Sequence, residues 1–237
     1  MTPITTIVRA ALVLCLLAPG LARAEDAKPV EGPPSGDKAP WPHVRVDREA
    51  GVVEFDAKVV LDDAEWLELI VCTTGGREYE AIAATDARPS HIHLALMTVG
   101  LEPGNPSAWQ RNDKDDLVQI KPTGPQVAVT IHWEQDGKKH ETSANRWIKD
   151  AKSGEAMPGE AWLFTGSQLV EHNGERIYMA DANGTVISLV NFGDDLMSRD
   201  TDLTNQTDEG QWVANGEAIP PAGTAITVRL TPVKPKP

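Results

Sequence analysis

Apolar and polar residues alternate along several stretches of this chain, and this period-two pattern constrains the fold more than any other feature. Every odd-numbered residue is apolar in the stretches 53–61 and 127–133, as is every even-numbered residue in 226–230. Successive side chains of a β-strand point to opposite faces, so each stretch predicts a strand with one buried face. The sequence therefore predicts a mainly β fold of the α+β kind, with antiparallel β-sheets in a sandwich-like arrangement.

One segment departs from this alternation and predicts a single short amphipathic helix near residues 88–99. Pro89 and Ser90 are typical of a first helical turn, and Gly100 is typical of a helix end. Between them, apolar residues recur at the spacing of three and four that places side chains on one helix face. We expect this helix to pack on a sheet.

A hairpin is predicted in the second half of the chain. The stretches ERIYMAD, residues 175–181, and TVISLVNF, residues 185–192, are separated by Asn183-Gly184. Asn-Gly between two strand-like stretches is a strong signal for a tight β-turn. The two stretches are therefore expected to pair with each other.

Residues 1–24 have the features of a secretory signal peptide. Arg9 precedes an apolar run too short to span a membrane, and Ala22-Arg23-Ala24 supplies small residues before a cleavage point. We expect export to the periplasm or the extracellular space, with no transmembrane anchor after cleavage. Lipidation of Cys15 is not expected, because Leu14 stands where a lipoprotein signal has a small residue.

The rest of the chain divides into three parts. Residues 25–42 are rich in proline and predict an extended, disordered spacer, residues 43–233 predict a single β-rich domain, and residues 234–237 predict a disordered tail. The formal net charge of the chain is −13. This charge disfavours binding to nucleic acid and to anionic membrane surfaces.

Cys72 is the only cysteine that remains after cleavage of the signal peptide. A free cysteine is usually a buried, inert side chain of apolar character. Its position ahead of Gly75-Gly76 and Arg77 leaves a second interpretation open, in which the guanidinium stabilises a reactive or metal-ligating thiolate. An intermolecular disulfide is a third alternative.

Two blocks of the sequence carry a family resemblance. The first is LELIVCTTGGREYEA, residues 67–81, with TDARPSHIHLALMTVGLEPGNP at 85–106, and the second is AWLFTGSQLVEHNGERIYMADANGTVISLVNF, at 161–192, with AIPPAGTAITVRLTPV at 218–233. In this order they resemble the YdjY-type domain of exported bacterial proteins, over nearly all of residues 50–233. The resemblance implies little about function. Cys72, Arg77, Glu78, Glu80 and His93 match the family pattern, whereas Tyr79 and Ala81 replace its histidine and serine, and His91 is a local addition.

A metal site is one hypothesis for these residues. Cys72 and His93, with Glu80 or His91 as a third ligand, are donor types that bind copper or zinc. On a helix, however, His91 and His93 point about 200° apart, so this pair alone does not predict chelation.

Aromatic residues suggest a second kind of site. Trp109 and Trp212 lie in loop-like surroundings and are expected to be exposed, and with Arg77 they are the candidate ligand-binding residues. Trp66, Trp133 and Trp162 fall within strand patterns, which favours packing in the core.

No complete catalytic motif is present in the sequence, so no reaction and no cofactor are predicted. The leading hypothesis is an exported accessory domain that binds an envelope protein or a glycan. The alternative is a redox or metal-handling protein, for copper or zinc, that uses Cys72 and His93. The protein is more readily interpreted as a binding module than as an enzyme.

Overall fold

The computed structural model describes residues 41–234. The signal peptide predicted at 1–24, most of the spacer predicted at 25–42 and the last residues of the predicted tail lie outside the described residues. Trp41, which the prediction placed in the spacer, packs against the core. No helix among residues 41–234 combines the length and apolar character needed to cross a membrane.

The described residues form sixteen strands, two α-helices and two short 3₁₀ helices. In chain order they are β1 (Val44–Asp47), β2 (Val52–Val59), β3 (Leu69–Thr73), η1 (Glu78–Glu80), β4 (Ala81–Thr85), α1 (Pro89–Thr98), β5 (Ala108–Arg111), β6 (Leu117–Ile120), β7 (Gln126–Gln135), β8 (Lys138–Ser143), η2 (Ala144–Trp147), β9 (Ile148–Asp150), β10 (Ala161–Phe164), β11 (Leu169–His172), β12 (Glu175–Tyr178), α2 (Met179–Asn183), β13 (Thr185–Ser188), β14 (Met197–Ser198), β15 (Trp212–Ala214) and β16 (Ala225–Pro232).

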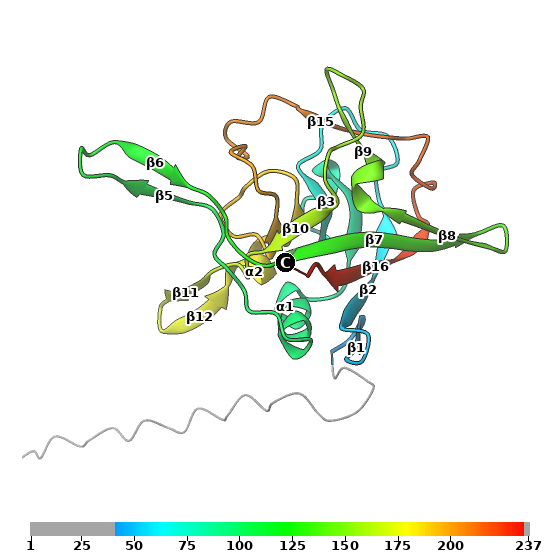
Figure 1. Cartoon of the computed structure of the whole chain (residues 1–237), viewed down its shortest axis with the longest axis horizontal. Helices are drawn as coiled ribbons and strands as arrows, with labels where there is room; N and C mark the ends of the chain where they lie inside the picture. Colours follow the sequence, from blue (N-terminus) through cyan, green and yellow to red (C-terminus); the bar gives the residue numbers. More distant parts are fainter. Residues whose placement is uncertain (1–40, 235–237) are drawn as a thin grey trace, which may run out of the picture. The chain divides into compact units, whose positions relative to one another are not determined.

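Eight of these strands close into a barrel (Figure 1). Their order is β2-β16-β7-β10-β14-β13-β3-β4, and β4 pairs back onto β2. Lys58 and Val59, at the end of β2, lie opposite Ala84 and Ala83, which completes the ring. The β-rich prediction is confirmed. The sheet forms a closed ring rather than a sandwich, because the long β2 pairs with β16 along its length and with β4 at its end.

The predicted alternation accounts for the barrel interior. In β2, β7 and β16 one face is buried and the other faces outward, as expected for strands with one buried face. The buried residues on these faces are Val53, Phe55, Val59, Val127, Val129, Ile131, Ile226, Val228 and Leu230. They form one contiguous core with Trp147, Trp162 and Phe164.

Two of the strand pairings are parallel, β3 with β4 and β13 with β14. Because β3 and β4 are consecutive and parallel, residues 74–80 must run back to the level where β3 begins. This connection contains η1 and is fixed by Glu78, whose Oε1 accepts a 2.7 Å hydrogen bond from the Gly75 amide. It brings residues that precede β3 and β4 to the same end of the barrel.

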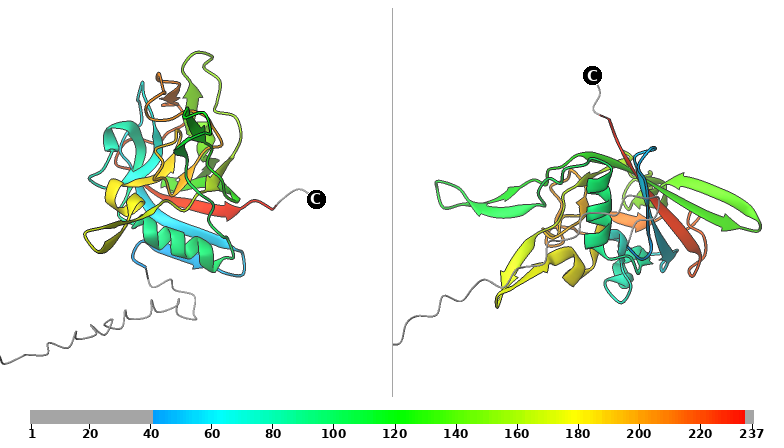
Figure 2. Two further views of the ribbon diagram at one scale, coloured as in Figure 1. Left: turned by 90° about the vertical axis from the view of Figure 1, so that its left-hand side faces the viewer. Right: turned by 90° about the horizontal axis from the view of Figure 1, so that it is seen from below.

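The predicted helix is confirmed as α1. Its buried residues Ile92, Ala95 and Leu96 join the core, and the helix packs against β1 and β2 (Figure 2). The first turn is held by Asp181 of α2, which accepts hydrogen bonds from the Ser90 amide at 2.8 Å and the Ser90 hydroxyl at 2.7 Å.

The predicted hairpin between residues 175–181 and 185–192 is wrong. Met179–Asn183 form α2, and Gly184 ends this helix in the left-handed conformation, with φ of 76°. The Asn-Gly pair therefore serves as a helix end, for which glycine is also favoured. β12 pairs instead with β11, and β13 pairs with β3 as part of the barrel wall.

Two hairpins extend beyond one side of the barrel, and the ends of β7 and β8 project beyond it on the other side (Figure 1). β5 pairs with β6, and β11 pairs with β12. Both hairpins extend from the same side of the barrel (Figures 1 and 2). Every residue of β5 and of β11 is exposed.

Candidate functional site

The parallel pairing of β3 and β4 brings two glutamates together at one end of the barrel. Glu68 immediately precedes β3 and Glu80 immediately precedes β4, and the Glu68 amide donates a 3.1 Å hydrogen bond to the Glu80 carbonyl. Glu68 is only 5 % exposed. A carboxyl group at such a position loses most of its hydration, so its neighbours decide which charge state it adopts.

Arg77 is the basic neighbour of this pair. Its Nη1 lies 3.2 Å from Oε1 of Glu80, and its guanidinium stacks on the Phe192 ring, 4.5 Å from the ring centre. Phe192 is itself held by Asp195, a fully buried carboxylate that accepts hydrogen bonds from the amides of Phe192 and Gly193. Arg77 is thus fixed from two sides.

Asp208 is the third carboxylate of this group. It is 8 % exposed, and its Oδ1 accepts a 3.1 Å hydrogen bond from the Gln211 amide. Its Oδ2 is buried and has no hydrogen-bond partner among the described residues. We refer to Glu68, Glu80 and Asp208 as the carboxyl cluster.

The electrostatics of the cluster favour a bound proton. Burial, followed by the charges of Glu80 and Asp208, raises the pKa of Glu68 to about 7, although the charge of Arg77 acts in the opposite direction. Arg77 compensates one negative charge, whereas the cluster holds three carboxyl groups. At neutral pH, the Glu68 carboxyl group is therefore protonated for much of the time.

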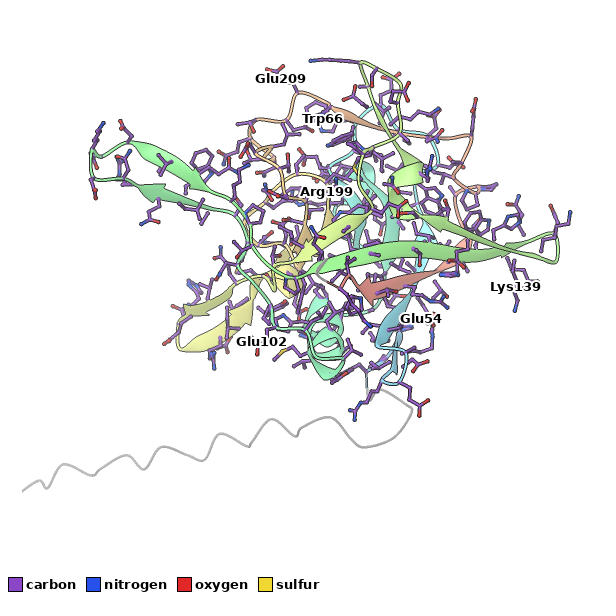
Figure 3. All side chains as sticks on the ribbon, viewed as in Figure 1. Glu54, Trp66, Glu102, Lys139, Arg199 and Glu209 are labelled. Carbon is purple, nitrogen blue, oxygen red and sulfur yellow. The ribbon has the colours of Figure 1, made fainter. Side chains whose placement is uncertain are left out.

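Two exposed aromatic residues lie close to these glutamates in the sequence. Trp66, two residues before Glu68, is 50 % exposed, and Tyr79, next to Glu80, is 74 % exposed. The expectation that Trp66 packs in the core is wrong, because it lies ahead of the first residue of β3. The Trp66 ring lies instead beside Gly210, next to the segment that carries Glu209 (Figure 3).

Cys72 is a packed side chain. It is fully buried in a small apolar cluster with Leu69, Ala81 and Ala84. Burial raises the pKa of the thiol to about 12, and the charges of Glu78 and Glu80 add to this effect. Such a thiol remains protonated and is a poor nucleophile at neutral pH.

His93 lies in a different environment. It projects from α1 onto the edge of Phe164, and its Nδ1 lies 2.9 Å from the Tyr178 hydroxyl. Burial lowers its pKa. His91, on the same helix, stacks on Trp41, and its Nδ1 is buried without a partner among the described residues.

The four predicted metal ligands therefore have different surroundings. Cys72 packs among apolar side chains, His93 contacts Phe164 and Tyr178, His91 contacts Trp41, and Glu80 pairs with Arg77. Within residues 41–234, no group of three or more His, Cys, Asp and Glu side chains is placed to hold a metal ion. Binding of copper or zinc stays a prediction, which metal analysis of protein purified under native conditions would test.

The three predicted ligand-binding residues also lie in different surroundings. Trp109 is 47 % exposed on β5, as expected. The expectation of an exposed Trp212 is wrong: it is 9 % exposed, because β15 pairs with β9 and directs the ring into the core. Arg77 borders the carboxyl cluster.

The sequence reasoning missed Glu68, Asp208 and Phe192. Glu68 had a local signal, since it is the one charged residue in the apolar stretch 67–72. Asp208 and Phe192 had no local signal, because Asp208 acts on Glu68, and Phe192 packs on Arg77, only in the folded chain.

These features define a class of protein: a closed β-barrel domain with a buried carboxyl cluster at one end and two hairpins, β5–β6 and β11–β12, that project from one side. A family model, the YdjY domain, matches residues 44–231, and the chain belongs to this family. No curated protein and no solved structure matches the chain.

Proposed function

We propose that this protein is an exported accessory domain that binds a protein partner in the periplasm or cell envelope, and that the two projecting hairpins form its binding surface. No reaction is assigned to it. The observation that carries the proposal is the exposure of large apolar side chains on hairpins that lie outside the barrel. These side chains are Trp109, Leu117 and Ile120 on β5–β6, and Leu169 and Val170 on β11.

The β5–β6 hairpin presents apolar residues on both faces. From the register of the pairing, Trp109 and Leu117 share one face, and Ile120 lies on the other. A two-stranded hairpin is marginally stable by itself, so apolar side chains at such a position gain little from folding. Exposed apolar residues that are grouped in this way are typical of interaction sites.

The chemistry of the hairpins favours a protein over a glycan. Four of the five exposed apolar residues are aliphatic, and only Trp109 offers a flat aromatic ring. The turn between β5 and β6 contains three aspartates, Asp113, Asp115 and Asp116, with Lys114, and it follows Arg111 at the end of β5. A partner that combines apolar and basic groups would complement this surface.

Photo-cross-linking in the native host tests this proposal. A photo-reactive residue at position 117 or 169 is expected to give a discrete protein adduct, and Trp109→Ala is expected to weaken the adduct from position 117. Val233 is an exposed apolar residue outside the hairpins and serves as the control position. The absence of adducts from both hairpins, or an equal adduct from position 233, would argue against this surface.

Export is part of the same proposal and has its own test. The predicted cleavage after Ala24 means that protein recovered from the native envelope should begin at Glu25. N-terminal mass spectrometry measures this directly. An intact N-terminus in the mature protein would contradict export by this signal.

A further inference from the structure

We propose that the free edge of β6 is a self-association site, at which two copies of this chain pair as antiparallel strands. β5 and β6 form a sheet of two strands, so each strand has one edge that no other strand among residues 41–234 occupies. The hairpin stands apart from the barrel (Figures 1 and 2). This inference goes beyond the proposed partner surface, because it uses the edge of the hairpin and leaves its faces accessible.

β6 is an unprotected edge strand. Natural proteins commonly place charged residues or proline on such edges, which discourages pairing with another chain. Residues 117–120 are Leu, Val, Gln and Ile, without charge, proline or glycine. The other free-edge strands of four or more described residues all carry charge: Arg45 and Asp47 in β1, Arg111 in β5, Lys138, Lys139 and Glu141 in β8, Glu171 in β11, and Glu175 and Arg176 in β12.

The hydrogen-bond pattern identifies the backbone groups of β6 that point outward. At the closed end of the hairpin, the Asn112 amide donates a 2.9 Å hydrogen bond to the Asp116 carbonyl. Hydrogen-bonded and non-hydrogen-bonded pairs alternate along an antiparallel ladder, so the next pair, Arg111 with Leu117, is non-hydrogen-bonded. The N–H and C=O groups of Leu117 and Gln119 therefore point away from β5.

These outward groups are spaced for a second copy of the same strand. With Val118 opposite its counterpart, Leu117 of each copy faces Gln119 of the other, and the outward groups of both residues are paired. A register shifted by two residues would place one of them opposite residue 115 or 121, outside β6. The symmetric pairing uses the same residues on both copies, so it closes as a dimer.

The apolar side chains support the same pairing. Leu117 is 60 % exposed in the single chain. In the paired hairpins, β5-β6-β6-β5 form one sheet, in which the two Leu117 side chains become diagonal neighbours on one face and the two Val118 side chains meet on the other. Two strands alone are marginally stable, whereas a sheet of more strands with apolar contacts is not.

Charge complementarity favours a second copy over an unrelated strand. The symmetric register places Lys121 of the partner subunit opposite Asp115 and next to Asp116. Within one chain, Lys121 pairs with Asp202 at 3.0 Å, and both side chains are more than half exposed. Exposed ion pairs contribute little to stability, so Lys121 can exchange Asp202 for the acidic turn at small cost.

A cysteine at position 118 tests the pairing. Facing residues of a non-hydrogen-bonded pair have Cα atoms about 4.5 Å apart, within the range of a disulfide. In the full chain with Cys15→Ser, the remaining Cys72 is buried. Oxidation of Val118→Cys with copper–phenanthroline should then give a disulfide-linked dimer. Gln110→Cys is the matched control, because Gln110 lies opposite Val118 on β5 and is separated from its counterpart by both β6 strands.

Sedimentation velocity measures the association without a cross-link. The edge is short, so we expect a weak dimer with a dissociation constant on the order of 10–100 µM. Gln119→Pro removes an outward N–H at a position where an edge strand tolerates proline, and it should weaken the dimer about tenfold or more. Arg111→Pro makes the same change on the free edge of β5 and should leave the dimer intact.

Three outcomes would overturn the proposal. They are a monomer up to millimolar concentration, equal disulfide formation from positions 110 and 118, and a dimer that Gln119→Pro does not weaken. Photo-cross-linking in the native host separates this site from the proposed partner surface. An adduct of two identical chains from position 117 supports the dimer. An adduct with a different protein at 117, together with a monomer in sedimentation, would assign the edge to that protein instead.

Discussion

The Tyr178 hydroxyl oxygen lies 2.9 Å from Nδ1 of His93 and 2.9 Å from the carbonyl oxygen of Gly166. A carbonyl oxygen only accepts hydrogen bonds, so the phenol proton is directed at Gly166 and Nδ1 of His93 donates to the phenol oxygen. Burial raises the pKa of Tyr178 and lowers the pKa of His93. Two neutral side chains therefore join α1, β12 and the segment after β10.

Removal of the Tyr178 hydroxyl tests this link. Tyr178→Phe leaves Nδ1 of His93 and the carbonyl of Gly166 without their partner, and buried groups left unpaired cost about 1–3 kcal/mol. Urea unfolding should show a loss of this size. Tyr79→Phe is the matched control, because Tyr79 is 74 % exposed and should change little. Equal stabilities for the two variants would show that the link contributes nothing.

Gly166, whose carbonyl accepts from Tyr178, is itself closely packed by its neighbours. Its φ is +81°, and a Cβ atom placed there would lie 2.4 Å from Cβ of Pro103 and 3.2 Å from Cε1 of His93. Gly166→Ala combines an unfavourable backbone conformation with a clash that typically costs a further 1–3 kcal/mol, as a rough guide. Gly137→Ala has a similar φ of +72° with nothing within 4 Å, and it isolates the backbone effect. Thermal unfolding should place the 166 variant clearly below the 137 variant. If the two melt together, the segment after β10 adapts more easily than its packing indicates.

Truncation of Trp109 and of Trp162 should change the stability of the fold by very different amounts. Trp109 is 47 % exposed on its hairpin, so Trp109→Ala should change the free energy of unfolding by less than about 0.5 kcal/mol. Trp162 is fully buried, and its Nε1 donates a 3.1 Å hydrogen bond to the Ser188 carbonyl. Trp162→Ala should cost about 3–5 kcal/mol. A large loss at Trp109 would mean that the hairpin serves the stability of the fold rather than binding.

Sequence reasoning succeeded for this fold where the signal is local. The strand alternation around Phe55 and Ile131 and the helix start at Pro89 depend on neighbouring residues only, and all three predictions are confirmed. Closure of the barrel depends on which strands pair, and no short stretch records that β4 returns to β2. The Asn183-Gly184 pair shows the limit of a local signal, because the same dipeptide suits a tight turn and a helix end.

The same contrast between local signals and long-range pairing applies to the candidate site. Arg77 was selected because it is a charged residue near a Gly-Gly turn, and it does border the carboxyl cluster. Trp212 was misassigned, because its polar, loop-like surroundings hide a short strand that pairs with β9. Glu68 and Glu80 lie together because β3 and β4 are parallel, and no local signal in the sequence records this pairing.

Cys72 should be unreactive in the folded protein. Burial and nearby carboxylates raise the pKa of its thiol to about 12, whereas an exposed thiol ionises near 8.5. In a Cys15→Ser background, labelling by a disulfide reagent at pH 8 should be roughly a thousandfold slower in native buffer than in urea. Comparable rates in the two conditions would show that the thiol is accessible and would revive a reactive role.

Glu68 gives the protein a specific dependence of stability on pH. Its pKa rises from an ordinary 4.5 to about 7 on folding, so the folded protein holds a proton that the unfolded chain releases between these values. The stability contributed by Glu68 is thus highest below about 4.5 and is lost as the pH rises towards 7, by about 3 kcal/mol in total. Burial also raises the pKa of Asp195 to about 7, and this adds a loss of stability in the same direction.

Glu68→Gln removes only the contribution of Glu68, and the contribution of Asp195 cancels when the stability of the variant is compared with that of the wild type. In urea unfolding, the variant should therefore gain stability relative to the wild type between pH 4.5 and pH 8. Glu65→Gln, at an exposed position, should show no such trend, and a parallel pH profile for Glu68→Gln and the wild type would rule out a buried, proton-holding carboxyl at this site.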